Sequence, residues 1–210
     1  MAGALLHTDA AQAAGKVPIN VAADGIDLLS LTAHKMYGPK GCGALYVRRR
    51  VPVAPMLVGG GHEHGLRAGT LNVPGIVGLG RACAIAEEEM VAEGCRLSRL
   101  RDRLLDGLMT LGGVTVNGSR EHRLAHNLHV SFDGVDGEAL LIGIGDVAVS
   151  SGSACTSASG LPSHVLSAIM GDTPVPSAAI RFGLGRFTTV DEIDYTIAKF
   201  SAVVRHLRQS

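Results

Sequence analysis

The chain has 210 residues, of which 46% are hydrophobic and 18% are charged, enough apolar material for one large domain or two small ones. Nineteen basic residues balance nineteen acidic ones, so no overall charge attracts nucleic acid or an anionic membrane. Aromatic residues make up 3% of the chain and tryptophan is absent, which argues against a base-stacking surface. Twenty-eight glycines without a collagen period indicate many turns and close backbone approaches, which favours a mixed α/β enzyme. We expect it to act on a small substrate and to have no nucleic-acid or membrane partner.

Residues 1 to about 75 are predicted to form strands and loops. Three short apolar runs, at residues 4–7, 27–31 and 43–47, lie between turns, as buried strands of a largely parallel sheet do. Helical periodicity then runs from Val73 to about Leu111, with Pro74 in the first turn and Gly94 as a point where the helix could break. We expect this helix to connect two domains.

The remaining residues alternate between predicted strands and helices. Strands are expected at 114–116, 127–132, 147–150 and 179–184, and helices at about 137–144 and 163–170. The last helix is the clearest, because Thr189 and Glu192 form a capping box. An apolar stripe at helical spacing follows, made by Ile193, Ile197, Phe200, Val204 and Leu207.

The four cysteines show no C-x-x-C pair and no zinc-type spacing. Three of them, Cys42, Cys83 and Cys95, are predicted to be inert and buried, because free cysteine usually behaves as a small hydrophobic residue. The N-terminus lacks a basic region and a long apolar run, and no segment has 18 uninterrupted apolar residues. These features predict a cytoplasmic protein with reduced thiols.

Polar residues follow the first two predicted strands. They are Asp9 and Gln12 after the first, and Thr32, His34 and Lys35 after the second. Ligands of open α/β sheets collect at the carboxyl ends of strands, so these side chains could converge on one crevice. A lysine with a depressed pKa can form a Schiff base with an aldehyde. The alternative is that they are solvated loop residues.

A glycine-rich stretch runs from Gly59 to Thr70 and contains Arg67. Its backbone could approach a phosphate or a neighbouring subunit closely. Two other interpretations remain: a metal site that uses His62, Glu63 and His64, or a plain structural turn.

Two further features lie in the second half of the chain. Cys155 lies in the stretch S-S-G-S-A-C-T-S-A-S-G, among serines, a threonine and glycines. These side chains are too small to bury the cysteine, which favours an exposed thiol that other molecules can reach. Arg181 lies in a predicted strand, where it could hold a carboxylate with two hydrogen bonds or form a surface salt bridge.

In this order, these stretches resemble the cysteine desulfurases of the NifS and IscS type, which are pyridoxal-phosphate enzymes. The matching sequences are H-T-D-A-A-Q, S-L-T-A-H-K-M-Y-G-P-K-G, G-G-G-H-E-H-G-L-R-A-G-T, N-L-H-V-S-F, S-S-G-S-A-C-T-S-A-S and I-R-F-G-L-G-R-F-T-T. The resemblance implies an α/β fold, part of a fold-type I PLP-dependent transferase with an incomplete large-domain sheet, a long connecting helix and an α+β small domain. Residues 1–90 would belong to the cofactor-binding domain and residues 91–210 to the small domain.

The resemblance also implies a role for each matching residue. Lys35 would form the Schiff base with pyridoxal 5'-phosphate, and Thr32 and His34 would bind its phosphate. Asp9 would pair with the pyridine nitrogen and Gln12 with the ring hydroxyl. Thr70 would bind the phosphate held by the partner subunit of a homodimer. Arg181 would bind the carboxylate of L-cysteine, and Cys155 would attack its sulfur.

The resemblance predicts a cysteine desulfurase that delivers sulfur to an iron-sulfur scaffold or another acceptor protein. Compared with this family, the chain begins near the middle of the large domain, so it resembles a C-terminal portion. A second difference is His64, at a position where relatives commonly have arginine. Two alternatives follow: an inactive remnant that serves as a binding module, and a related enzyme that acts on selenocysteine.

Overall fold

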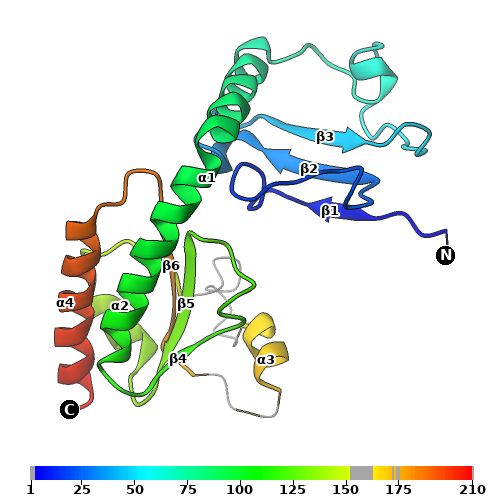
Figure 1. Ribbon diagram of the computed structural model, residues 1–210. Helices are drawn as coiled ribbons and strands as arrows, with labels where there is room; N and C mark the ends of the chain where they lie inside the picture. Colours follow the sequence, from blue (N-terminus) through cyan, green and yellow to red (C-terminus); the bar gives the residue numbers. More distant parts are fainter. Residues whose placement is uncertain (1–2, 152–162, 172, 174–175, 210) are drawn as a thin grey trace. The chain divides into compact units, whose positions relative to one another are not determined.

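The computed structural model describes residues 3–151, 163–171, 173 and 176–209. The chain divides into two units, Met1–Ala92 and Glu93–Ser210. Among the described residues, each unit has a three-stranded sheet (Figure 1). Each unit also has a hydrophobic core of its own. No helix among the described residues is both long enough and apolar enough to cross a membrane.

The sheet of the first unit contains β1 (His7–Asp9), β2 (Leu28–Thr32) and β3 (Gly43–Val47), in that order. Strands β1 and β2 are parallel, whereas β2 and β3 are antiparallel. The described sheet is therefore mixed, not largely parallel as predicted. The segment between Thr32 and Gly43 is too short for the crossover that a parallel pair requires, so β3 turns back along β2.

The described residues of this unit also form the 3₁₀ helices η1 (Ala33–Lys35), directly after β2, and η2 (Glu63–Gly65), in the glycine-rich loop. The core beneath η1 uses small side chains. Ala33 is fully buried, and a Cβ added to Gly38 would lie 3.0 Å from the Cβ atoms of Ala33 and Ala82. This close approach fixes the turn that follows β2 against the start of α1 (Val73–Met109).

Helix α1 is continuous, so no break occurs at Gly94. A glycine in a helix interior costs only about 1 kcal/mol relative to alanine. Leu97, Leu100, Leu104 and Leu108 follow it at helical spacing, and all four are buried in the second unit's core. Packing of this apolar face outweighs the local cost of Gly94.

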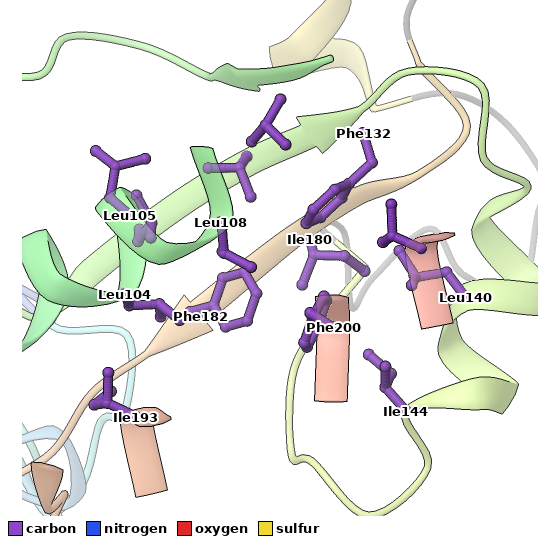
Figure 2. Packing of buried hydrophobic residues seen from close by; sticks show 14 of the residues in the cluster. Leu104, Leu105, Leu108, Phe132, Leu140, Ile144, Ile180, Phe182, Ile193 and Phe200 are labelled. Carbon is purple, nitrogen blue, oxygen red and sulfur yellow. The ribbon is translucent and has the colours of Figure 1, made fainter. Parts of the chain in front are cut away.

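The second unit has an antiparallel sheet with the order β4 (Val114–Val116), β5 (Asn127–Phe132) and β6 (Ala179–Gly183). In the described part of this unit, the strands are separated or followed by the helices α2 (Gly137–Gly143), α3 (His164–Met170) and α4 (Val190–Leu207). Phe200 of α4 stacks near Phe132 and Phe182, with ring centroids 5.7 and 5.0 Å apart (Figure 2). These aromatic contacts and the surrounding leucines hold α4 to the sheet.

Most predicted elements of the second unit are confirmed, including the capping box in which Thr189 and Glu192 bond each other's backbone. The predicted strand at 147–150 is wrong, since only Ser150 pairs, through a single bridge with Arg181. The alternation of valines there resembles a strand, but the chain turns after α2, with the amide of Val147 bonding the carbonyl of Ile144.

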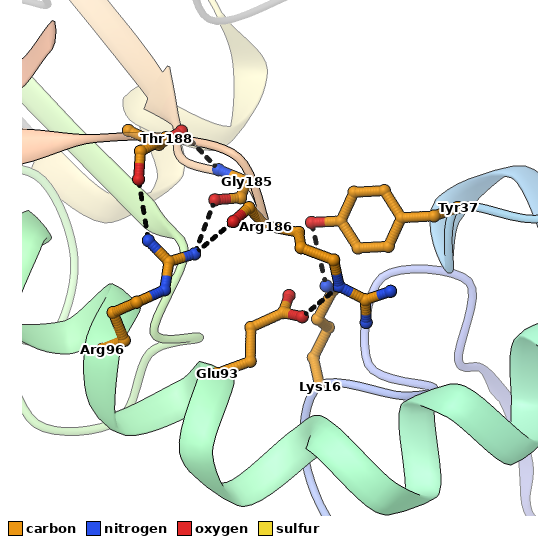
Figure 3. Close-up of polar contacts among 7 residues, drawn as sticks. All are labelled: Lys16, Tyr37, Glu93, Arg96, Gly185, Arg186 and Thr188. Carbon is orange, nitrogen blue, oxygen red and sulfur yellow. Dashed lines mark hydrogen bonds and ion pairs between the residues drawn. The ribbon is translucent and has the colours of Figure 1, made fainter.

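Arg96 of α1 fixes the segment between β6 and α4. Its guanidinium donates hydrogen bonds to the carbonyl oxygens of Gly185, Arg186 and Thr188 at 2.6–3.1 Å (Figure 3). Arg186 in turn pairs with Glu93, with Nε 2.8 Å from the carboxylate. The I-R-F-G-L-G-R-F-T-T stretch therefore leaves the sheet along a path set by α1.

Candidate functional site

The first candidate site lies at the carboxyl ends of β1 and β2. Because these strands are parallel and Asp9 pairs with Ser30, Asp9 and Thr32 reach the same edge of the sheet. The chain bends directly after both strands, which places Gln12 beyond Asp9 and places His34 and Lys35 in η1. The structure thus brings five of the predicted residues to one edge, Asp9, Gln12, Thr32, His34 and Lys35.

Hydrogen bonds within the turn orient Thr32 and His34. The Thr32 hydroxyl and His34 Nδ1 are 2.9 Å apart, and the same hydroxyl lies 3.4 Å from the carbonyl oxygen of Cys42. If Thr32 donates to that carbonyl, then Nδ1–H of His34 donates to the Thr32 oxygen. This short chain of bonds fixes the imidazole ring beside the start of η1.

Lys35 follows as the last residue of η1 and is exposed. Its neighbours Ala33 and Met36 are buried, at 0% and 4% exposure. The backbone that carries the lysine is therefore anchored, whereas its amine extends away from the core. An anchored backbone with a reachable amine suits a lysine that bonds a ligand.

Asp9 is exposed, and its Oδ1 accepts a hydrogen bond of 2.9 Å from the amide of Ala11. This bond forms a local turn that holds one carboxylate oxygen in place. An amine, a hydroxyl, an imidazole and a carboxylate thus share this edge. An aldehyde that carries a phosphate and a basic ring nitrogen needs an amine to react with its carbonyl carbon, hydrogen-bond donors for its phosphate and a carboxylate to pair with its ring nitrogen.

The glycine-rich loop contains Thr70, which is exposed and lies between η2 and α1. Glu63 and His64 both have positive φ angles, 49° and 56°, so the loop turns sharply there. The described residues contain no group of three or more histidine, cysteine, aspartate or glutamate side chains that could hold a metal ion. The loop does not supply the metal site that was one interpretation of its sequence.

The second candidate site is in the other unit, around Arg181. Arg181 lies on β6 between His129 of β5, its direct partner, and Ser150, with which it exchanges backbone hydrogen bonds of 2.7 and 3.2 Å. Its Nη2 also lies 3.4 Å from the Ser150 hydroxyl. Ser150 comes five positions before Cys155 in the sequence, so Arg181 anchors the start of the serine-rich stretch. Cys155 itself is outside the described residues.

His129 is a candidate that the sequence prediction missed. Directly opposed residues of an antiparallel pair share a face, so His129 lies on the same face as Arg181. Its Nε2 is buried and has no hydrogen-bond partner among the described residues. Burial, followed by the positive charges of Arg181 and Arg123, lowers the pKa of His129. The alternation of residues 127–132 could have placed it beside Ser131 on this face.

The other cysteines differ from the prediction. Cys42 is half-buried, and Cys83 and Cys95 are exposed on α1. Both helical cysteines fall outside the apolar face of α1 that enters the two cores. The expectation that all three are buried is therefore wrong. For Cys83 and Cys95, the register of α1 decides burial, not the residue type.

Comparison with known proteins identifies the family of this chain. Residues 1–196 match the aminotransferase class-V family, and the chain belongs to this family. Its sequence is 56% identical over 211 residues to the cysteine desulfurase IscS of Anaeromyxobacter dehalogenans (strain 2CP-C), covering 99% of this chain and 52% of that protein. It is 54% identical over 209 residues to the cysteine desulfurase IscS of Methylobacillus flagellatus, with the same coverage. The chain spans about half the length of these curated relatives.

Solved structures agree with this assignment. A NifS-like protein superposes with a TM-score of 0.85 at 38% identity, covering 96% of this chain and 53% of that one. A NifS-like protein from Rickettsia africae gives a TM-score of 0.84 at 30% identity, covering 95% of this chain and 53% of that one. These similarities confirm the predicted fold, part of a fold-type I PLP-dependent transferase.

Proposed function

We propose that this chain carries the lysine and cysteine of a cysteine desulfurase. The reaction would take the sulfur of L-cysteine, leave L-alanine and load Cys155 as a persulfide. The sulfur would then serve iron-sulfur cluster assembly or tRNA thiolation, through a scaffold or another acceptor protein. The protein would work as a cytoplasmic homodimer.

The observation that carries this proposal is the turn after β2. Lys35 follows directly on the bonded pair Thr32 and His34, at the edge that Asp9 shares through the parallel pairing of β1 and β2. Curated relatives with 54–56% identity are named cysteine desulfurases, which supports the same chemistry for this edge.

The side chains at this edge fit pyridoxal 5'-phosphate. Thr32 and His34 would hold its phosphate, Asp9 the pyridine nitrogen, Gln12 the ring hydroxyl and Lys35 the aldehyde carbon. Thr70 would contact the phosphate bound by the partner subunit. When bound, the cofactor supplies an electron sink for the bond changes at the substrate.

Each remaining step belongs to a residue of this chain. Arg181 would hold the carboxylate of L-cysteine through its guanidinium fork. Lys35 would remove the proton from the α-carbon of the substrate and later return it. The thiolate of Cys155 would attack the substrate sulfur, so that an S–S bond forms as the C–S bond breaks, and a proton completes the methyl group of alanine.

Lys35→Ala tests the cofactor assignment. The protein is incubated with pyridoxal 5'-phosphate, reduced with borohydride and mapped by peptide mass spectrometry. We expect the phosphopyridoxyl group on Lys35 in the wild type and loss of specific labelling in Lys35→Ala, because that amine is the one placed at the edge of β1 and β2.

Lys40→Ala is the matched control, since Lys40 is an exposed lysine in the same connection between β2 and β3. It should label Lys35 like the wild type. Equal labelling of both lysines would contradict the assignment. Absence of any labelling would favour the alternative that the chain acts only as a binding module.

A further inference from the structure

A small pocket opens in the second unit between α1 and the segment that connects β4 to β5. Its volume is about 190 Å³, well below the range of roughly 300–1,000 Å³ that holds drug-sized ligands. It has room for a small ion or a short molecule. Neither Arg181 nor Ser150 lines it.

Three arginines line this pocket, Arg101 from α1 and Arg120 and Arg123 from the connecting segment. The guanidinium of Arg123 donates to the carbonyl oxygens of Asn117 and Ser119 through Nη2 and Nε, at 2.6 and 2.8 Å. Its remaining nitrogen, Nη1, is buried and has no hydrogen-bond partner in the described part of the chain. Buried donors are nearly always satisfied, whereas Arg123 keeps a cationic group beside the pocket with one donor unpaired among the described residues.

The charges around Arg123 are not balanced locally. Burial and then the positive charges of Arg101 and Arg120 lower the pKa of Arg123. The surroundings therefore disfavour the charged form of the Arg123 guanidinium. Asp102 and Asp106 also line the pocket, and Asp102 pairs with Arg101 at 2.8 Å. Three guanidiniums against two carboxylates leave a net positive lining.

The floor of the pocket is apolar, since Leu105, Val116 and Leu128 complete its lining. Leu105 and Leu128 are buried, at 8% and 1% exposure. A guanidinium fork matches the oxygens of a phosphate or a carboxylate, and an apolar floor raises the strength of such contacts by excluding water.

We propose that this pocket binds a small oxyanion, a phosphate or carboxylate group, with the exposed Arg120 as its main contact. The anion would reduce the repulsion among the three guanidiniums. This inference concerns the second unit alone and does not depend on the proposed desulfurase activity.

The test is a titration of the 210-residue protein followed by amide NMR, with inorganic phosphate in one series and butyrate in another. Chloride keeps the ionic strength constant. We expect saturable shifts at residues 101–106 and 116–123 with at least one of the two anions. Whichever anion binds identifies whether the headgroup is a phosphate or a carboxylate.

Arg120→Gln should weaken this binding about tenfold, because one charge-assisted hydrogen bond is lost. Arg120 is exposed and has no ion pair among the described residues, so the variant should fold. Arg99→Gln is the control, since it removes an equally exposed charge from α1 outside the pocket.

Three results would overturn the proposal. The first is a lack of saturable shifts with both anions. The second is equal weakening by Arg120→Gln and Arg99→Gln, which would show only nonspecific charge attraction. The third is a set of shifts confined to residues 32–35, which would place anion binding at the candidate cofactor site instead.

Discussion

At the scale of single residues, the two candidate sites differ in how their side chains are held. Thr32 and His34 are fixed by a bond to each other in an exposed turn, whereas His129 is enclosed beside Arg181 with one ring nitrogen unpartnered among the described residues. The sequence placed Thr32 and His34 together after the second predicted strand, but it did not predict the bond between them. The alternation of residues 127–132 gives the face on which His129 lies, but its burial could not be predicted, because burial depends on pairing with a strand about fifty residues later.

His129 should make stability depend on pH. In the unfolded chain the ring takes up a proton near its ordinary pKa of 6.5, whereas burial and two arginines lower that pKa in the folded state. The unfolded state therefore binds more protons below pH 6.5, and the free energy of unfolding falls as the pH falls through the window beneath that value.

Urea unfolding on both sides of pH 6.5 measures this effect. His129→Gln should lose less stability on acidification than the wild type, because glutamine takes up no proton. His122→Gln, at an exposed histidine, should keep the wild-type dependence. An unchanged pH dependence in His129→Gln would show that the ring is not protected from protonation.

At the scale of elements, two of the glycines in α1, Gly94 and Gly107, face different surroundings. A Cβ on Gly94 would meet no atom within 4 Å, whereas a Cβ on Gly107 would lie 2.6 Å from Cδ1 of Ile197 on α4. Gly94 thus only weakens the helix, while Gly107 permits α1 and α4 to approach closely.

Matched alanine substitutions separate these roles. Gly94→Ala should raise the free energy of unfolding by about 0.5–1 kcal/mol through helix propensity. Gly107→Ala should lower it by about 1–3 kcal/mol through overpacking against Ile197. Chemical denaturation of both variants gives the comparison, and destabilisation by Gly94→Ala would mean that α1 bends at that position.

Sequence periodicity predicted the long helix, the capping box at Thr189 and most strands of the second unit. It wrongly predicted a strand at residues 147–150, and it did not predict that β3 runs antiparallel to β2. Both depend on the lengths of connections and on which neighbouring strand accepts the hydrogen bonds, and local patterns do not contain that information.

At the scale of the whole molecule, the predicted chemistry is divided between two units. Lys35 lies in the first unit, and Arg181 lies in the second, as does Cys155 by its position in the sequence. Family membership and motif order led to this assignment from sequence. The arginine-lined pocket was not predicted, because Arg101 and Arg123 lie outside the matching stretches and share a pocket only when the connection between β4 and β5 packs on α1.

The most direct test of the desulfurase proposal follows the sulfur atom. The protein is incubated with pyridoxal 5'-phosphate and L-cysteine, and its peptides are analysed by mass spectrometry. We predict a gain of one sulfur atom on Cys155 with release of alanine, and neither product in Lys35→Ala. The exposed thiols of Cys83 and Cys95 serve as internal controls that should gain none. Sulfur on all three cysteines alike, or a gain on Cys155 that persists in Lys35→Ala, would contradict the proposal.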